Sequence, residues 1–238
     1  MTWSILAYDA ASGAFGVAVT SRAFAVGARM PYIRAGIGAV ATQSITNPYL
    51  GPRVLDGLER GLAPEAALEA ALAQDPGREL RQLHAVDRHG RSAAWTGRHC
   101  VAWAGHGAAA GVSAAGNMLR SERVLAATLE GYAAATGKLA ERLLAALDAG
   151  EAAGGDRRGR QSAALLVATT EDFPDIDLRV DDHAAPLAEL RRLLDYYRRE
   201  FEPQRGLYPS KANPAGLTDL DAIEAQWRAR GLDLRFSR

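Results

Sequence analysis

The residue with the clearest capacity for chemistry is Thr2, which directly follows Met1. Threonine is small enough for the methionine-removing aminopeptidase to act on Met1, and this step would leave Thr2 with a free α-amine. Such a residue carries a nucleophile and a base together, because its hydroxyl attacks while its amine accepts the proton. The amine has an ordinary pKa of about 7.7–8.0, so part of it is neutral near pH 7. Many proteins begin with Met-Thr and do not use the threonine in catalysis. Whether Thr2 is catalytic therefore depends on the elements that surround it.

Those elements predict that Thr2 stands on a sheet. Residues 3–8 alternate between apolar and less apolar positions, which predicts a strand. Asp9 to Gly13 has the composition of a turn, and residues 15–22 predict the returning strand. A hairpin of this kind would hold a hydroxyl and an amine in fixed geometry, which a disordered tail would not do.

The rest of the first 170 residues predicts strands that alternate with helix pairs. Expected strands cover residues 38–43, 82–87, 92–96, 99–103, 107–117 and 161–169, and expected helices cover 50–62, 64–74, 123–135 and 138–149. Residues 23–34 form a connection in this interpretation. The order of the elements predicts an α+β fold, and it would suit two sheets packed between two helical layers.

The character of the chain changes after about residue 180. Residues 186–202 predict a charged amphipathic helix, residues 203–216 a link, and residues 218–230 a second helix. We therefore expect a main domain over 1–180 and a C-terminal helical extension, 181–238, docked on it. The link is expected to be a surface connection, with a lid over the active site as the alternative.

Composition limits the function classes. The 28 basic and 28 acidic residues cancel, which argues against binding to nucleic acid or anionic membranes. The single cysteine, Cys100, excludes an internal disulfide and is expected to be a buried structural thiol. No pair of histidines has a helical metal-ligand spacing, so we expect no metal and no other cofactor. Without a leader or a run of membrane-spanning length, a cytoplasmic protein is expected.

Several blocks of the sequence resemble a known superfamily, the N-terminal-nucleophile (Ntn) hydrolases. More closely, the chain resembles a bacterial family placed there, the domain of unknown function ten-twenty-eight. The similarity covers roughly residues 2 to 170. The blocks that carry it are the N-terminal hairpin, residues 35–43 with Thr46-Asn47-Pro48, Trp103-Ala104-Gly105-His106, Gly116-Asn117-Met118-Leu119 and residues 154–163.

The resemblance implies a four-layer αββα sandwich and hydrolysis of an amide by Thr2. By analogy it also suggests a homodimer. Proteasome-like members carry an aspartate after the second strand and a lysine after the next segment. Here Thr20-Ser21-Arg22 takes the first position, and Arg34 or Arg29 lies near the second. Arginine cannot act as a base, although Arg34 can lower the pKa of the hydroxyl or bind a carboxylate. The departure favours a small-molecule amidase over a protease.

Two further segments supply candidate groups around Thr2. Asp156 is expected to orient the α-amine and Thr2, and Arg157 or Arg160 to pair with a substrate carboxylate or with Asp156. The alternative is a tight turn with solvated arginines. Asn117 is expected to donate its amide to the oxyanion, with a turn residue as the alternative.

The other candidate oxyanion or substrate-binding groups are Ala41 and Thr42, through their backbone N–H groups, and Ser21 and His106. The leading hypothesis is therefore an amidohydrolase that cleaves a small amide, such as an N-acyl amino acid, a short peptide or a cyclic amide. A silent relative that binds a small ligand in the same cleft is the first alternative. An assembly protein is the second, and an exposed apolar stripe of Leu187, Leu190, Leu194 and Tyr197 would favour it.

Overall fold

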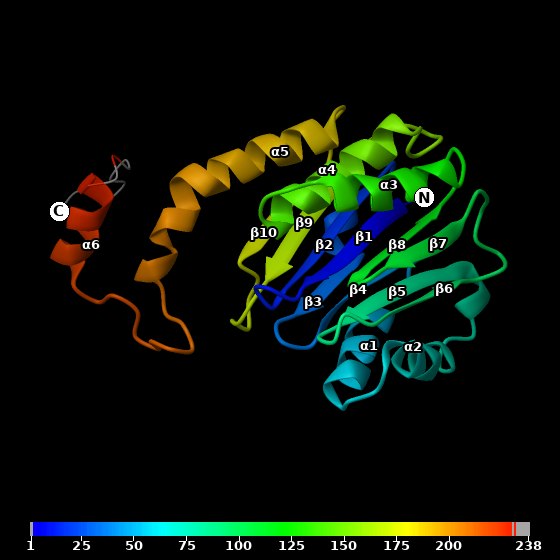
Figure 1. The fold of residues 1–238 in the computed structure, drawn as a ribbon, viewed down its shortest axis with the longest axis horizontal. Coiled ribbons are helices and arrows are strands. Elements are labelled where there is room, and N and C mark those ends of the chain that lie inside the picture. Colours follow the sequence, from blue (N-terminus) through cyan, green and yellow to red (C-terminus); the bar gives the residue numbers. More distant parts are fainter. Residues whose placement is uncertain (1, 230, 232–238) are drawn as a thin grey trace. The chain divides into compact units, whose positions relative to one another are not determined.

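The computed structural model describes residues 2–229 and residue 231. It divides the chain into two compact units, residues 1–190 and 191–238. The first unit holds the candidate site and consists of two antiparallel sheets and two helix pairs (Figure 1). A mixed α+β fold was expected, and the structure confirms it.

The larger sheet has six strands and places β1 near its centre. Its order is β10-β9-β2-β1-β8-β7, and every neighbouring pair is antiparallel. The strands are β1 (Thr2–Asp9), β2 (Ala14–Ser21), β7 (Gly105–Ala109), β8 (Val112–Asn117), β9 (Ser162–Ala168) and β10 (Ile176–Val180). The N-terminal hairpin is the expected one, and β8 pairs along the free side of β1.

The smaller sheet has four strands in the order β3-β4-β5-β6, again antiparallel. It contains β3 (Pro31–Arg34), β4 (Gly38–Ser44), β5 (Arg81–Asp87) and β6 (Ser92–Thr96). Its outer face is covered by α1 (Leu50–Glu59) and α2 (Pro64–Leu72), which bury Leu50, Val54 and Leu68 against Val40 and Leu83.

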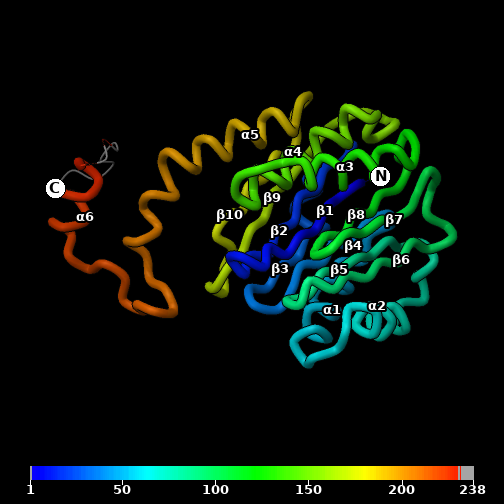
Figure 2. The backbone as a smooth tube through the Cα atoms, in the orientation of Figure 1, coloured from blue at the N-terminus to red at the C-terminus, as the bar shows by residue number. Residues whose placement is uncertain are grey.

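The two sheets pack on each other through a second apolar cluster. Leu6, Phe15 and Val17 from the larger sheet meet Ala39 and Val86 from the smaller one. The outer face of the larger sheet is covered by α3 (Arg123–Ala134) and α4 (Leu139–Ala152), as Figure 2 also shows. The layers therefore run helix pair, sheet, sheet, helix pair.

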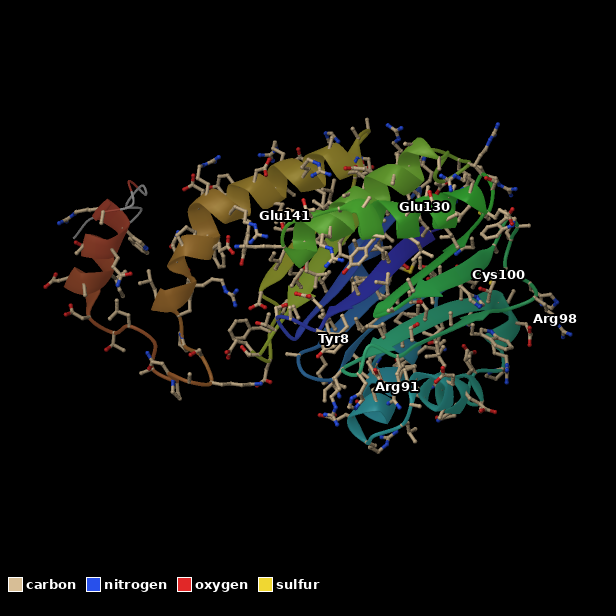
Figure 3. All side chains as sticks on the ribbon, viewed as in Figure 1. Tyr8, Arg91, Arg98, Cys100, Glu130 and Glu141 are labelled. Atoms are coloured by element: carbon tan, nitrogen blue, oxygen red, sulfur yellow. The ribbon has the colours of Figure 1, made fainter. Side chains whose placement is uncertain are left out.

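The structure corrects several of the expected elements. Residues 31–34 and 176–180 are strands that sequence reasoning missed, and residues 99–103 form no strand. The expected strand 107–117 is a hairpin, because Gly111 turns the chain with a φ of 71°. Cys100, expected to be buried, is half-buried in the loop between β6 and β7 (Figure 3), where its thiol donates to the Arg81 carbonyl.

The C-terminal region is helical, but less regularly than expected. Helix α5 (Pro186–Tyr196) gives way to a π-helical turn (Tyr197–Phe201) and a 3₁₀ helix (Glu202–Leu207), and α6 (Leu220–Ala229) follows. Residue 230, included in the expected second helix, lies outside the described residues. The apolar stripe whose exposure would favour an assembly protein is not exposed, since Leu187, Leu190, Leu194 and Tyr197 are all buried. None of the helices described here combines the length and apolar character needed to cross a membrane.

The packing of α4 on β2 makes a stability prediction. Leu143 is fully buried, and a Cβ placed on Gly16 of β2 would collide with its Cδ1, so the helix lies directly on the strand. Leu143→Ala should lower the free energy of unfolding by about 2–5 kcal/mol, because it removes apolar contacts and leaves a cavity. Urea unfolding measures this. Leu80→Ala is the control because Leu80 is partly exposed, and equal losses in both variants would contradict the layer assignment.

Candidate functional site

The site lies at the end of the larger sheet where β1 begins. In a strand, alternate side chains point to the same face. Leu6 points into the space between the sheets, so Thr2 and Ser4 on the same strand point there as well. Thr2 is paired with Asn117, the last residue of β8. Thr2 is 1% exposed and Asn117 2% exposed.

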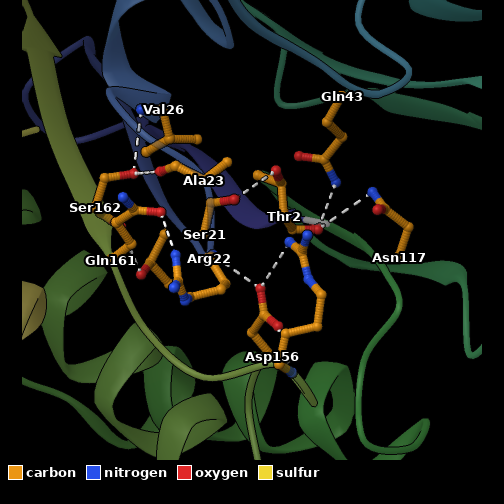
Figure 4. A network of polar contacts seen from close by, with 12 residues as sticks. Thr2, Ser21, Arg22, Ala23, Val26, Gln43, Asn117, Asp156, Gln161 and Ser162 are labelled. Atoms are coloured by element: carbon orange, nitrogen blue, oxygen red, sulfur yellow. Dashed lines mark hydrogen bonds and ion pairs between the residues drawn. The ribbon is translucent and has the colours of Figure 1, made fainter. Parts of the chain in front are cut away.

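Thr2 is held by its side chain and by its main chain (Figure 4). Its Oγ1 donates a hydrogen bond to Ser21 Oγ at the end of β2, over 3.2 Å. Its carbonyl oxygen accepts from Asn117 Nδ2 at 3.3 Å and has a longer contact of 3.5 Å with Gln43 Nε2. The residue is therefore contacted from β2, β8 and the opposite sheet.

A buried amide network extends from these contacts. Gln82 on β5 accepts hydrogen bonds at Oε1 from Gln43 Nε2 at 2.8 Å and Asn117 Nδ2 at 3.0 Å. Asn117 thus uses both amide hydrogens, one on Gln82 and one on Thr2. In this arrangement Asn117 orients Thr2 and has no hydrogen left for an oxyanion.

The network continues to His84, which lies two residues after Gln82 and is fully buried. Ser4 Oγ donates to Gln43 Oε1 at 2.8 Å and lies 2.8 Å from His84 Nε2. Because the Ser4 hydrogen is used on Gln43, His84 Nε2 must be the donor to Ser4. His84 Nδ1 is then the acceptor for the Ser113 hydroxyl at 3.0 Å. This is the neutral histidine, and burial lowers its pKa to about 3, with a smaller contribution from His106.

Asp156 lies beside this cluster and anchors the loop that follows α4. Its carboxylate accepts from the backbone N–H of Arg22 and of Arg158, both at 2.8 Å, and pairs with the Arg158 guanidinium at 3.3 Å. Arg22 directly follows Ser21, so Asp156 fixes the strand end that carries the partner of Thr2 (Figure 4). Its contacts support a positioning role through Ser21.

Three of the expected residues are not brought to Thr2 in the expected way. Arg34 pairs with Asp56 and Glu59 on α1, at the end of β3 that pairs with Gly38. Gln43 stands at the far end of β4 from Gly38, so Arg34 lies at the other end of the sheet from the site.

Ala41 packs between the sheets, and its main chain lies within the β3-β4-β5 ladder. The Thr42 N–H donates to the Met30 carbonyl at 3.0 Å.

The remaining expected residues lie around the periphery. Arg160 pairs with Glu151 on α4, whereas Arg157 is exposed and its backbone N–H donates to the Met118 carbonyl. His106 stands on β7, where its Nδ1 lies 2.9 Å from Thr96 Oγ1. Burial lowers the pKa of His106.

Five residues of this network were not predicted from the sequence: Ser4, Gln43, Gln82, His84 and Ser113. The signal that could have found them is the two-residue period. Gln43 continues the inward positions Ala39 and Ala41, and Gln82 and His84 continue inward from Val86. Polar residues on the buried side of a strand indicate a buried polar network.

No group of three or more His, Cys, Asp or Glu side chains able to hold a metal ion occurs among residues 2–229 and 231. Two cavities in the described part of the chain are lined by residues other than Thr2 and its hydrogen-bond partners. One of about 330 Å³ lies between α4 and the start of α5, beside Glu151 and Pro186. The other, of about 220 Å³, is lined by Arg34 and Phe173.

A model for a family of unknown function, DUF1028, matches residues 2–190. The chain belongs to this family. It is also similar to the crystal structure of a DUF1028 protein from Silicibacter pomeroyi, at 34% identity and a TM-score of 0.86, over 92% of this chain and 96% of that chain. The expected family is thereby confirmed.

A second solved structure lies further away. Anbu (ancestral beta-subunit) from Yersinia bercovieri is 11% identical, with a TM-score of 0.37 over 83% of this chain and 97% of that chain. This similarity is too low to carry an argument. The comparison with curated proteins found no match.

The buried histidine of this DUF1028 protein makes a prediction about pH. The unfolded chain protonates His84 below about pH 6.5, whereas the folded chain does so only near pH 3. The unfolded state binds more protons between these values, so stability is lost as the pH falls through that window. The loss is at most about 1.4 kcal/mol per pH unit for one group, and His106 adds in the same direction.

Urea unfolding between about pH 7.5 and about pH 5 measures this slope. His84→Gln should give a flatter dependence, because glutamine does not titrate. His89→Gln is the matched control, since His89 is exposed in the turn after β5. Equal slopes in the native protein and His84→Gln would contradict the assignment.

Proposed function

We propose that this DUF1028 protein is an amidohydrolase of the Ntn type, with Thr2 as its nucleophile after Met1 is removed. The observation that carries the proposal is the position of Thr2. It is the first residue of a central strand, its hydroxyl is bonded to Ser21, and its carbonyl is held by Asn117. A nucleophile on a fixed strand end meets the requirement for positioned attack.

The layer order supports the same proposal. A helix pair, two sheets and a second helix pair correspond to the αββα sandwich that the sequence resemblance implies. In that arrangement the first strand begins at one end of the sheet pair, and the network of Gln43, Gln82 and Asn117 lies at the same end.

The proposed reaction needs no group beyond the chain and water. The Thr2 hydroxyl oxygen bonds to the substrate carbonyl carbon while the α-amine takes the hydroxyl proton. The amine then gives that proton to the departing nitrogen as the C–N bond breaks, which leaves an ester on Thr2. Water, deprotonated by the same amine, attacks the ester, and the proton returns to the Thr2 oxygen as the acid leaves.

The surroundings of Thr2 make its amine the base in this proposal. Among the described residues, the side chains that hydrogen-bond to Thr2 are those of Ser21, Gln43 and Asn117, all uncharged. Arg34 forms ion pairs with Asp56 and Glu59 on α1, so it does not polarise the Thr2 hydroxyl. Asp156 supports Ser21 through the Arg22 N–H.

The departure from the proteasome-like pattern favours a small amide over a protein substrate, because Thr20-Ser21-Arg22 takes the place of the activating aspartate and Arg34 lies near that of the lysine. Arg157 is the better candidate for binding a substrate carboxylate, because the Arg160 guanidinium is already paired with Glu151. An N-acyl amino acid, a short peptide or a cyclic amide fits this description.

The first prediction from the proposed function concerns the N-terminus. The untagged protein made in bacteria should have an intact mass lower by one methionine, because Thr2 permits removal of Met1. Intact-protein mass spectrometry measures this. A retained methionine would block the amine and leave the protein without its base, which would favour the hypothesis of a silent protein that binds a small ligand.

The second prediction concerns the hydroxyl. Thr2→Ala should reduce hydrolysis of small amides by at least about 10³-fold, because it removes the nucleophile. Thr2→Ser keeps a hydroxyl and should retain part of the activity. A panel of N-acyl amino acids, dipeptides and cyclic amides would be assayed by release of the amine, with circular dichroism to confirm folding. Full activity in Thr2→Ala would exclude the proposed nucleophile.

A further inference from the structure

We propose that Gln82 is a positioning residue for Thr2, an inference that rests on the proposed function. Gln82 belongs to the smaller sheet, and none of its hydrogen bonds among the described residues goes to Thr2. It acts through Gln43 and Asn117, the two side chains whose amide groups approach the Thr2 carbonyl. Through them it sets the direction from which the first residue of β1 is held.

The contacts of Gln82 make it the centre of the amide network. Its Oε1 accepts both from Gln43 Nε2 at 2.8 Å and from Asn117 Nδ2 at 3.0 Å. Gln43 belongs to β4 and Asn117 to β8, so one oxygen atom joins amides from the two sheets. The side chain is fully buried.

The other end of the same amide prevents it from turning over. Gln82 Nε2 lies 2.8 Å from the Gly116 carbonyl and 2.9 Å from the Gly105 carbonyl. Carbonyl oxygens only accept hydrogen bonds, so the nitrogen must face them. A reversed amide would set oxygen against oxygen here and NH₂ against NH₂ at Gln43 and Asn117. The orientation of Gln82 is therefore dictated by chemistry.

Gln43 is constrained in the same way from its own side. Its Oε1 accepts from Ser4 Oγ, and its Nε2 lies 3.0 Å from the Ala115 carbonyl. Together with Gln82 these contacts leave one arrangement. The Gln43 Nε2 hydrogens point to Gln82 and to the Ala115 carbonyl, with the Thr2 carbonyl at a longer 3.5 Å, and one Asn117 Nδ2 hydrogen points to Thr2. Burying amides is costly unless they are hydrogen-bonded. Apolar side chains fill the rest of this space, so the polar cluster is confined to the end where Thr2 lies.

The first test separates turnover from binding in the full-length protein. Gln82→Met has a similar shape but cannot hold the two amides. It should lower kcat by about 100-fold, the cost of a small misplacement of a reacting group. KM should change by less than about twofold, because Gln82 is remote from the substrate. Leu83→Ala is the matched control, since Leu83 is the next buried residue of β5 and faces the helices. It should destabilise the fold without changing kcat.

A second variant gives a readout that a merely structural role would not produce. Gln82→Glu carries a carboxylate that accepts hydrogen bonds but donates none, so it repels the Gly105 and Gly116 carbonyls. On protonation it gains one donor and again resembles an amide. Burial raises the pKa of such a carboxyl. The optimum for kcat in Gln82→Glu should therefore shift to lower pH than in the native protein, with the folded fraction measured at each pH.

The last measurement does not depend on activity. In ¹⁵N NMR spectra the side-chain NH₂ groups of Gln43 and Asn117 should exchange slowly in the native protein and at least about tenfold faster in Gln82→Met. Unchanged exchange, or kcat within about twofold of the native value, would overturn the positioning role. If the native protein and Thr2→Ala hydrolyse amides equally, the proposed function fails instead, and NMR exchange alone decides whether Gln82 orients the two amides.

Discussion

The pairing of β1 with β2 on one side and β8 on the other is the constraint on which the rest of the structure depends. It places Thr2 opposite Asn117 and brings the end of β2, with Ser21, within hydrogen-bonding distance. The same register turns Thr2 and Ser4 toward the smaller sheet, because alternate residues share a face. A one-residue shift in register would turn both toward α3 and α4 and would separate them from every group of the site.

The space between the sheets is divided into an apolar part and a polar part. Leu6, Phe15 and Val86 fill one part, and the amides of Gln43, Gln82 and Asn117 fill the other near Thr2. Hydrogen bonds are stronger in such a low-dielectric interior, but only a fully satisfied network is stable there. All the hydrogen-bonding side chains of this network are uncharged, and the low pKa of His84 keeps it so over the ordinary pH range. This environment leaves the proposed chemistry to the hydroxyl and amine of one residue.

Much of the fold could be predicted because the signals are local. The first hairpin, α1 to α4 and the apolar strand β9 follow from periodicity and turn residues, and the structure contains them all. Strand β3 was missed because it has only four residues and no clear alternation. Strand β10 is also short, but Ile176, Leu178 and Val180 alternate with Asp177 and Arg179, so its signal was present in the sequence and was overlooked. Arg34 was expected near Thr2 because it lies near the position of the lysine in proteasome-like members. The tight turn at Gly36 instead pairs it with the start of β4, at the far end from Gln43.

The sequence by itself determined that Thr2 opens a strand and that the chain has the blocks of its family. Only the tertiary structure decided that the polar residues of β4, β5 and β8 meet at Thr2. Thr2 contacts residues 19, 41 and 115 positions away, and Gln82 reaches residues 39 and 35 positions away in opposite sheets. Local periodicity indicates which face of a strand is buried. It contains no information on strand order or on which faces oppose each other, since these depend on packing of the whole unit.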